Sequence, residues 1–434
     1  MSRRNPQSPE EKAMLLRAQR YLPGAQNGNA SSGFEDGFIV KEGRGSKIYD
    51  FSGNEYIDYL MGSGPMILGH AHPAVVEAVR QCLERGSTYF LTSGVAIELA
   101  EEICRAVPCA EMVRFTTSGT DATFQCLRAA RAYRRRDKVL KFEGGYHGSH
   151  DYAMMSSYSF PLAEFPQPVP NSAGIPKVIQ ETVLVAPFND LEATTRIIRQ
   201  HHDQLAGVIV EPLQRIIPPA QGFLEGLREV TARYGIPLIF DEVVTGFRLA
   251  YGGAQEQYGV QPDMAAIGKV VGGGYPLAAV CGRAEIMRHY DSSQVAEAEY
   301  IPQVGTLNGN PIAATAGLAT LAELRKAGTY QRLHSVGRRL RTALQETLDR
   351  AEIPAQVVGD DTVFDVYFTD EKVTDYRSTL KANRDRMRQF NRLLLEQGIL
   401  KSGQKFYMSL AHTDEDVQRT IEAFQSVAEK LRAS

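Results

Sequence analysis

Four short segments of the chain carry side chains that could do chemistry. Asp241 and Glu242 follow the apolar run 238–240, so two carboxylates stand at the carboxyl end of an expected strand, where open α/β sheets bind ligands. Lys269 lies among small and apolar residues, and burial of this kind lowers a lysine pKa by up to ~3–5 units and makes the amine a nucleophile. Residues 116–121 combine hydroxyls with a glycine ahead of an expected helix, whose free N–H groups could hold a phosphate.

A fourth segment, residues 142–148, places Tyr146 and His147 on a glycine-rich loop directly after an expected strand. The aromatic ring could cover a planar cofactor. His147 and His150 could be metal ligands, but no further ligand follows at metal spacing, so we expect no metal. An amine that forms an imine, an acid that faces a ring nitrogen, a helix start that takes a phosphate and an aromatic cover together favour pyridoxal 5'-phosphate.

Each segment also has an ordinary structural interpretation. The two acids could cap the next helix or face solvent, Lys269 could extend along a helix into water, and Ser118 could be a plain helix N-cap. The pair Gly268-Lys269 is similar to the end of a nucleotide-binding P-loop. That motif needs glycine at position 263 and Ser or Thr at 270, where this chain has Asp263 and Val270, so the sequence argues against a nucleotide site of that type.

The composition excludes several classes of protein. The 434 residues are 43% hydrophobic and 23% charged, and 48 Lys and Arg against 51 Asp and Glu leave a net charge of -3. There is therefore no overall basic field to hold nucleic acid. The five cysteines are scattered and no apolar stretch follows Arg3 and Arg4, so we expect a reducing, cytoplasmic location. The segment 264–281 is interrupted by Lys269 and by glycines, which excludes a membrane span there.

Short apolar runs alternate with segments of helical period, which predicts an α/β fold. A continuous apolar strand is typical of a sheet that is covered on both faces. We expect strands at 138–142, 207–210 and 237–240, and helices at 74–85, 97–106, 120–136, 226–234 and 414–431. Residues 157–176 contain five prolines and predict a long irregular loop.

With these residues in view, the sequence resembles the class III (ω-type) aminotransferases of the fold-type I pyridoxal phosphate enzymes, and among them the glutamate-1-semialdehyde 2,1-aminomutases. The resemblance covers nearly the whole chain, through the segments 21–24, 53–58, 117–120, 145–148, 241–248, 268–274 and 408–413. It implies a large domain with a mostly parallel central sheet flanked by helices, and a smaller α+β domain formed by both termini. We expect an N-terminal small-domain segment 1–65, a large cofactor-binding domain 66–320 and a C-terminal small-domain part 321–434.

The resemblance also implies roles for individual residues. Lys269 is the expected Schiff-base lysine, and Asp241 is expected to pair with the pyridine nitrogen. The other expected cofactor contacts are Val243 and Tyr146 on the two ring faces, Ser118, Gly119 and Thr120 at the phosphate, His147 and Glu211 nearby, and Thr306 from the neighbouring subunit. The active enzyme is therefore expected to be a homodimer.

Three departures from the aminomutase pattern concern the substrate. The run 27–31 lacks the arginine that grips a substrate carboxylate in that family, and Ser31 cannot replace a guanidinium. The run 213–219 replaces a short loop, and Val244 stands where many relatives carry Gln. These differences favour an aminotransferase that moves an amino group from an amine or an amino acid, including ω- or β-amino acids, to a 2-oxo acid. Arg215 is our candidate carboxylate contact, next to a possible apolar pocket at 216–219.

Other functions stay open at this point. An aminomutase would move the amino group within one molecule and would need no external acceptor. A decarboxylase or racemase on the same fold would release carbon dioxide or invert a stereocentre. A binding protein that retains the fold would hold the cofactor without turnover, but Lys269 and Asp241 argue against it.

Overall fold

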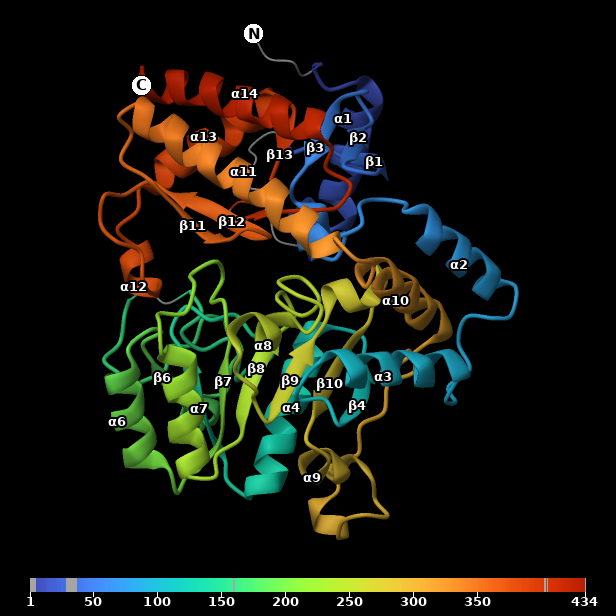
Figure 1. The fold of residues 1–434 in the computed structure, drawn as a ribbon, viewed down its shortest axis with the longest axis vertical. Helices are drawn as coiled ribbons and strands as arrows, with labels where there is room; N and C mark the ends of the chain where they lie inside the picture. Colours follow the sequence, from blue (N-terminus) through green and yellow to red (C-terminus); the bar gives the residue numbers. More distant parts are fainter. Residues whose placement is uncertain (1–4, 29–36, 159–160, 402, 404, 434) are drawn as a thin grey trace. The chain divides into compact units, whose positions relative to one another are not determined.

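The computed structural model describes residues 5–28, 37–158, 161–401, 403 and 405–433. The chain divides into two compact units (Figure 1). The terminal unit comprises Met1–Pro73, Ala327–Val373 and Ser378–Ser434, and the central unit comprises Ala74–Lys326 and Thr374–Arg377. The break between them falls just after helix α10 (Pro311–Leu324). The expected boundaries at 65/66 and 320/321 remain predictions.

The central unit is built on a seven-stranded sheet with the order β4-β10-β9-β8-β7-β5-β6. Its strands are β4 (Met112–Thr116), β5 (Lys138–Phe142), β6 (Val183–Ala186), β7 (Leu205–Val210), β8 (Leu238–Glu242), β9 (Met264–Ile267) and β10 (Ala278–Gly282). Strands β9, β8, β7, β5 and β6 are parallel, whereas β10 is antiparallel to both of its neighbours. The expected α/β fold with a mostly parallel sheet is confirmed.

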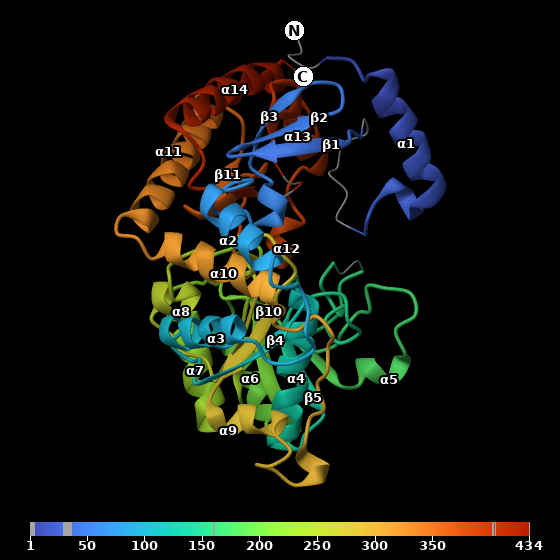
Figure 2. The same cartoon turned by 90° about the vertical axis from the view of Figure 1, so that its right-hand side faces the viewer.

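Helices cover both faces of this sheet, which is why its inner strands are almost wholly apolar. Figure 2 shows α4 and α7 on opposite sides of the strands. The α4 face buries a cluster that includes Val139, Ile209 and Ile239. On the other face, Phe142 of β5 packs edge-on against Phe223 of α7 at 5.6 Å between ring centroids.

The helices of the central unit are α2 (Pro73–Leu83), α3 (Gly94–Ala106), α4 (Gly119–Arg134), α5 (Lys177–Gln180), α6 (Leu191–His201), α7 (Phe223–Arg233), α8 (Gly253–Tyr258), α9 (Ala284–Met287) and α10, with α2 beginning on the last residue of the terminal unit. The helices expected at 74–85, 97–106, 120–136 and 226–234 are present with shifted ends. The described part of 157–176 contains neither helix nor strand, as the prolines predict.

The terminal unit is an α+β structure made from both ends of the chain. Its strands are β1 (Val40–Arg44), β2 (Lys47–Asp50), β3 (Glu55–Asp58), β11 (Gln356–Asp360), β12 (Val363–Tyr367), β13 (Ile399–Leu400) and β14 (Phe406–Tyr407), and its longer helices are α1 (Pro9–Tyr21), α11 (Thr329–Arg350), α13 (Arg384–Glu396) and α14 (Asp414–Arg432). The short helix α12 (Tyr376–Thr379) spans a boundary between the units. Strand β13 pairs in parallel with β3, which joins the two termini in one sheet.

Candidate active site

The segments singled out in the sequence meet at one edge of the central sheet, which we call the carboxyl edge: the ends of β4, β5, β7, β8 and β9. Strands β5, β7, β8 and β9 run in the same direction, and β4 shares it because β10 is antiparallel to both β4 and β9. Asp241 is the penultimate residue of β8, and each of the other strands is followed by one expected group: Ser118–Thr120, Tyr146 and His147, Glu211, and Lys269. The fold thus brings together five segments spread over about 150 residues.

Asp241 is buried, with 5% of its surface exposed, and both of its oxygens are engaged. Its Oδ2 lies 2.7 Å from His147 Nδ1, and Oδ1 accepts a hydrogen bond from the Val243 N–H at 3.1 Å. A carboxylate can only accept, so Nδ1 of His147 carries the proton in this pair. The contact joins residues 94 positions apart and was not predicted from the sequence. It fixes the direction in which the Asp241 carboxylate points.

His147 is itself held from a second side. The Thr123 hydroxyl of α4 donates to the His147 carbonyl at 2.5 Å. The other ring nitrogen, Nε2, is buried and has no hydrogen-bond partner among the described residues. A buried polar atom without a partner is uncommon in proteins, and this one lies in the imidazole that orients Asp241.

Lys269 begins a 3-10 turn, Lys269–Gly272, directly after β9 and Gly268. Asp241 pairs with Ala266 in the register of β8 and β9. Lys269 lies three residues beyond Ala266 along the chain. Its φ of +52° is left-handed, a conformation that costs an L-residue about 1–2 kcal/mol. The half-buried Lys269 therefore stands in a strained backbone position.

Glycines at the edge allow close packing around the start of α4. A Cβ on Gly119 would lie 2.7 Å from Val243 Cγ1, and one on Gly148 would lie 2.6 Å from Thr120 Oγ1. Ser118 is the N-cap of α4, and its Oγ accepts from the Asp121 N–H at 3.2 Å. The N-cap alternative for Ser118 is thus observed, in a helix start that leaves no room for larger side chains.

Tyr146 and Arg215 meet beside the loop after β5. The Tyr146 N–H donates to Glu211 Oε2 at 2.9 Å, and Arg215 Nε donates to the Gly144 carbonyl at 3.2 Å. The Arg215 guanidinium carbon lies 5.1 Å from the centre of the Tyr146 ring and 5.2 Å from that of Tyr158. Arg215 is therefore half-buried against aromatic rings instead of extending into solvent.

Other expected substrate and interface residues are placed differently. Ile216 and Ile217 are each 2% exposed and belong to the core. Thr306 is exposed on the loop that leads into α10. Positions 29–31, where the family arginine is missing, fall outside the described residues.

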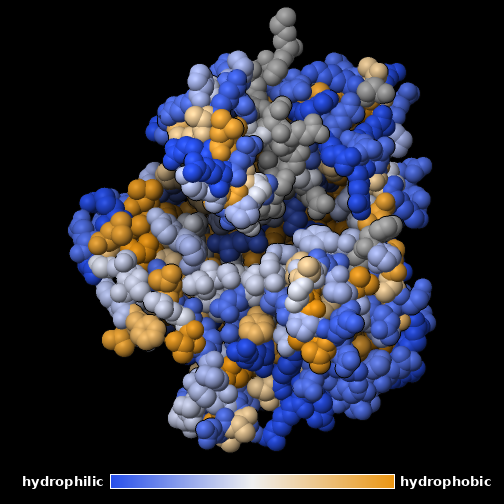
Figure 3. All heavy atoms as spheres, turned by 180° about the vertical axis from the view of Figure 1, so that it is seen from behind, coloured by the Kyte–Doolittle hydropathy of each residue, from blue (hydrophilic) through white to orange (hydrophobic). Residues whose placement is uncertain are grey.

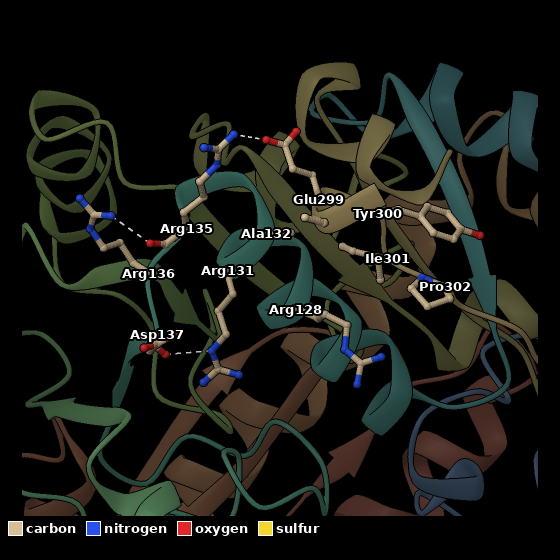
Figure 4. Close-up of a pocket in the computed structure, with 11 residues that line it drawn as sticks. Arg128, Arg131, Ala132, Arg135, Arg136, Asp137, Glu299, Tyr300, Ile301 and Pro302 are labelled. Carbon is tan, nitrogen blue, oxygen red and sulfur yellow. Dashed lines mark hydrogen bonds and ion pairs between the residues drawn. The ribbon is translucent and has the colours of Figure 1, made fainter. Parts of the chain in front are cut away.

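A concavity at the C-terminal end of α4 contains none of the expected site residues. Figure 4 shows it lined by arginines of α4 and by residues 299–302. Arg131 Nε donates to the Asp137 carbonyl at 2.8 Å, Arg135 is paired with Glu299, and Arg136 Nε donates to the Asp203 carbonyl. These contacts explain the arginine cluster as support for the end of the helix, where cations are favoured.

The described residues contain no group of three or more His, Cys, Asp or Glu side chains that could hold a metal ion. His150, the other candidate metal ligand, accepts a hydrogen bond from the Ala153 N–H at its Nδ1, at 3.2 Å. Burial, together with the positive charges of His147, Lys141 and Arg131, lowers the pKa of His150 to about 3. Among the helices that the structure describes, none has the length and apolar character to cross a membrane.

Comparisons with known proteins agree on one family. The sequence pattern of the family described as Aminotransferase class-III matches residues 30–428. A glutamate-1-semialdehyde 2,1-aminomutase of Desulforamulus reducens is 41% identical, over 96% of this chain and 97% of that protein.

Two solved structures extend the comparison to the fold. An omega-transaminase from Sphaerobacter thermophilus superposes with a TM-score of 0.93 at 35% identity, covering 99% of both chains. A glutamate-1-semialdehyde-aminomutase from Pseudomonas aeruginosa PAO1 gives a TM-score of 0.87 at 26% identity, covering 98% of this chain and 95% of that one. The chain therefore belongs to the class-III aminotransferases, enzymes that act on small molecules with pyridoxal 5'-phosphate as cofactor.

Proposed function

We propose that the carboxyl edge is the cofactor site, with Lys269 bound to the cofactor's aldehyde carbon and Asp241 facing its ring nitrogen. Val243 and Tyr146 would contact the two ring faces, and Ser118, Gly119 and Thr120 would hold the phosphate at the start of α4. The close packing around Gly119 and Gly148 and the unpartnered buried Nε2 of His147 support the fit. They leave a tight cradle and one polar atom that a bound group could satisfy.

The environment of Asp241 suits its proposed task. An exposed ion pair contributes only ~0–1 kcal/mol, whereas each unit by which a partner raises a pKa corresponds to about 1.4 kcal/mol. Asp241 is 5% exposed and is oriented by His147 and by the Val243 N–H. It can therefore keep a proton on the ring nitrogen. When bound, the cofactor supplies the electron sink that makes a carbanion next to nitrogen accessible.

For the reaction, we propose transfer of an amino group from an amine or amino acid to a 2-oxo acid. The substrate amine would take the place of Lys269 on the cofactor, and the freed lysine amine would then accept the proton that leaves the amine-bearing carbon of the substrate. The observation that supports a two-substrate reaction is the position of Arg215. This residue belongs to a loop unlike that of the aminomutases, and its guanidinium carbon lies 5.1 Å from the centre of the Tyr146 ring. The similarity to the Sphaerobacter omega-transaminase agrees with it.

A second candidate is amino transfer within one molecule, as in glutamate-1-semialdehyde 2,1-aminomutases. The curated relatives support it directly: proteins of that name are 41% identical over 428 residues and 44% identical over 423 residues. The names of the relatives therefore favour this second reaction, and the departures near the substrate favour the first. A direct assay has to decide between them.

We also propose a homodimer in which Thr306 completes the partner's phosphate site. The central unit exposes large apolar side chains on either side of this loop and in residues 89–91. Leu91 is 81% exposed, Val304 80%, Phe90 64% and Leu307 49%, and Figure 3 shows apolar side chains gathered on the side of this unit that carries α2, α3 and α10. Apolar surface of this kind marks an interaction site. Sedimentation that shows a monomer at micromolar concentration would contradict the dimer.

The first experiment tests the cofactor site. Borohydride reduction of the yellow protein, followed by peptide mass spectrometry, should place the reduced cofactor on Lys269. Lys269→Ala should carry no label. Label on another lysine, or none on the wild type, would contradict the assignment.

The second experiment separates the two reactions. With an amino donor and a 2-oxo acid, a two-substrate transferase turns over repeatedly, and without the acceptor it stops after one turnover. An aminomutase turns over glutamate-1-semialdehyde with no acceptor. Arg215→Met should lower kcat/KM roughly tenfold or more for donors with a carboxylate, because a charged hydrogen bond is lost, but not for carboxylate-free amines. Equal losses for both donors would remove Arg215 from substrate binding.

A further inference from the structure

Lys141 is a buried lysine that the proposed reaction does not use. It lies on β5, between β7 and β6, and is 1% exposed. Among the described residues, no carboxylate forms an ion pair with its ammonium group. Because burial of an unpaired charge is costly, the neutral groups around this lysine must make its position tolerable.

Four oxygens surround the Lys141 ammonium. Its Nζ lies 3.0 Å from the Gly145 carbonyl, 2.8 Å from that of Ala153, 2.5 Å from that of Met155 and 2.8 Å from Ser157 Oγ. The Ser157 hydroxyl also lies 2.8 Å from the Gly145 carbonyl and 2.9 Å from that of Ala153. An ammonium has three N–H donors, so this set of oxygens engages all of them.

All four oxygens belong to one loop, residues 143–157, which leaves β5 and folds back over its end. Gly145 stands at the start of the loop, immediately before Tyr146, and the other three acceptors stand on its return. The same loop contains His147, whose ring bonds to Asp241. The ammonium therefore joins the two arms of the segment from which Tyr146 and His147 project.

We propose that Lys141 is a positioning residue, whose buried ammonium closes the 143–157 loop and so holds Tyr146 and His147 in place against Glu211 and Asp241. The geometry of the loop stands on its own contacts, and only the consequence for cofactor binding rests on the proposed function. A methionine of similar length could fill the space but could donate to none of the four oxygens.

The charge state of Lys141 provides a second test of the proposal. Burial lowers its pKa to about 7; Glu211 and Asp241 act in the opposite direction, and Arg215 acts with burial. His150 also faces it from the loop, and burial keeps that imidazole neutral over the range in which Lys141 titrates. Above pH 7 the amine loses one donor, so the four-oxygen cluster can no longer be satisfied as it is below pH 7.

The matched control is Lys401, the fully buried lysine of the terminal unit. Its Nζ lies 2.9 Å from Asp365 Oδ2 and 2.9 Å from Asn391 Oδ1, and it is 1% exposed. Lys141→Met and Lys401→Met each remove one buried ammonium. A general loss of stability would therefore appear in both variants, whereas loosening of the 143–157 loop is expected only in the first.

Amide hydrogen exchange in the cofactor-free protein at pH 6.5 measures the loop directly. In Lys141→Met we expect peptides from 143–157 to exchange roughly tenfold faster or more, since a hydrogen bond to a charged group is lost. Dissociation of pyridoxal 5'-phosphate, followed by its absorbance, should weaken by a similar factor. Lys401→Met should leave both values within about twofold of the wild type. Equal effects in the two variants, or unchanged exchange in Lys141→Met, would overturn the proposal.

The pH dependence of cofactor affinity is a measurement that a purely structural role of Lys141 would not change. Between pH 6.5 and 8.5, the affinity of the wild type for the cofactor should fall as the Lys141 ammonium loses its proton. This part of the fall should be absent in Lys141→Met. Identical pH profiles would count against the proposal. If Lys141→Met does not fold, Ser157→Ala removes one acceptor and one donor from the same cluster, and it should speed exchange in 143–157 alone. If the wild type binds no cofactor but the exchange pattern holds, the proposed function fails and the role of Lys141 in the loop stands.

Discussion

The carboxyl edge of the central unit and the interior of the terminal unit hold their buried lysines in different ways. At the edge, His147 Nε2 has no partner among the described residues, Lys269 has a left-handed backbone, and Lys141 is surrounded by neutral oxygens. In the terminal unit, Lys401 is paired with Asp365 at 2.9 Å, and Tyr59 bonds to Thr420 at 2.8 Å.

The difference separates function from stability. Strain and unsatisfied polar atoms persist only where the surrounding structure holds them, and they concentrate at sites that bind or react. A buried lysine with its own carboxylate is satisfied without any ligand. The contrast predicts that substitutions at the carboxyl edge act mainly on binding and turnover, and that those inside the terminal unit act mainly on the free energy of unfolding.

The largest effect is expected from Asp241→Asn. The amide has the size of the carboxylate but cannot hold a proton on a ring nitrogen, so kcat should fall roughly 10²–10³-fold, as when a preorganised charge-stabilising group is removed. The denaturant midpoint of the cofactor-free protein should change little. Steady-state kinetics and denaturation curves measure the two quantities. A variant that keeps its turnover, or loses it only because it unfolds, would break the comparison at this residue.

Asp365→Asn is the converse in the terminal unit. The substitution leaves the Lys401 ammonium buried without its carboxylate, and breaking a buried ion pair in this way costs about 3–5 kcal/mol. Chemical denaturation should show this loss, while the absorbance of the bound cofactor stays unchanged below the unfolding transition. If turnover fell as far as in Asp241→Asn at equal stability, the division of roles between the two regions would be wrong.

Much of the fold could be predicted because apolar runs identify strands that are covered on both faces. The strand expected at 138–142 is β5 without adjustment, and the helix expected at 414–431 is α14 within one residue. The expected boundary at 320/321 stays a prediction; it lies within α10, a helix whose apolar residues continue to Leu324.

Motifs could indicate candidate site residues but not their contacts with one another. The bond between His147 and Asp241 depends on the order of β5, β7 and β8 in the sheet, and local spacing does not contain that order. Lys141 did leave a signal, since a charged residue stands among the apolar residues Val139, Leu140 and Phe142. Its partners are loop carbonyls, which no side-chain motif can report.

Gly119→Ala tests the close packing of Gly119 against Val243 at the carboxyl edge. Its Cβ would lie 2.7 Å from Val243 Cγ1, and overpacking of this kind costs about 1–3 kcal/mol. Cofactor affinity should fall with stability, because the helix start and Val243 must move apart. The second substitution Val243→Ala should restore part of the stability. Without such rescue, the contact between these two residues would not be the cause.

The smallest predicted effect has the opposite sign. Lys269 adopts a φ of +52°, which glycine accepts without strain, so Lys269→Gly should stabilise the cofactor-free protein by about 0.5–1 kcal/mol relative to Lys269→Ala. Both variants lose the amine and therefore turnover, so the comparison isolates the backbone. Denaturant midpoints measured side by side give the difference. A glycine variant no more stable than the alanine variant would mean that the lysine's backbone relaxes freely, and the carboxyl edge would then store no strain at Lys269.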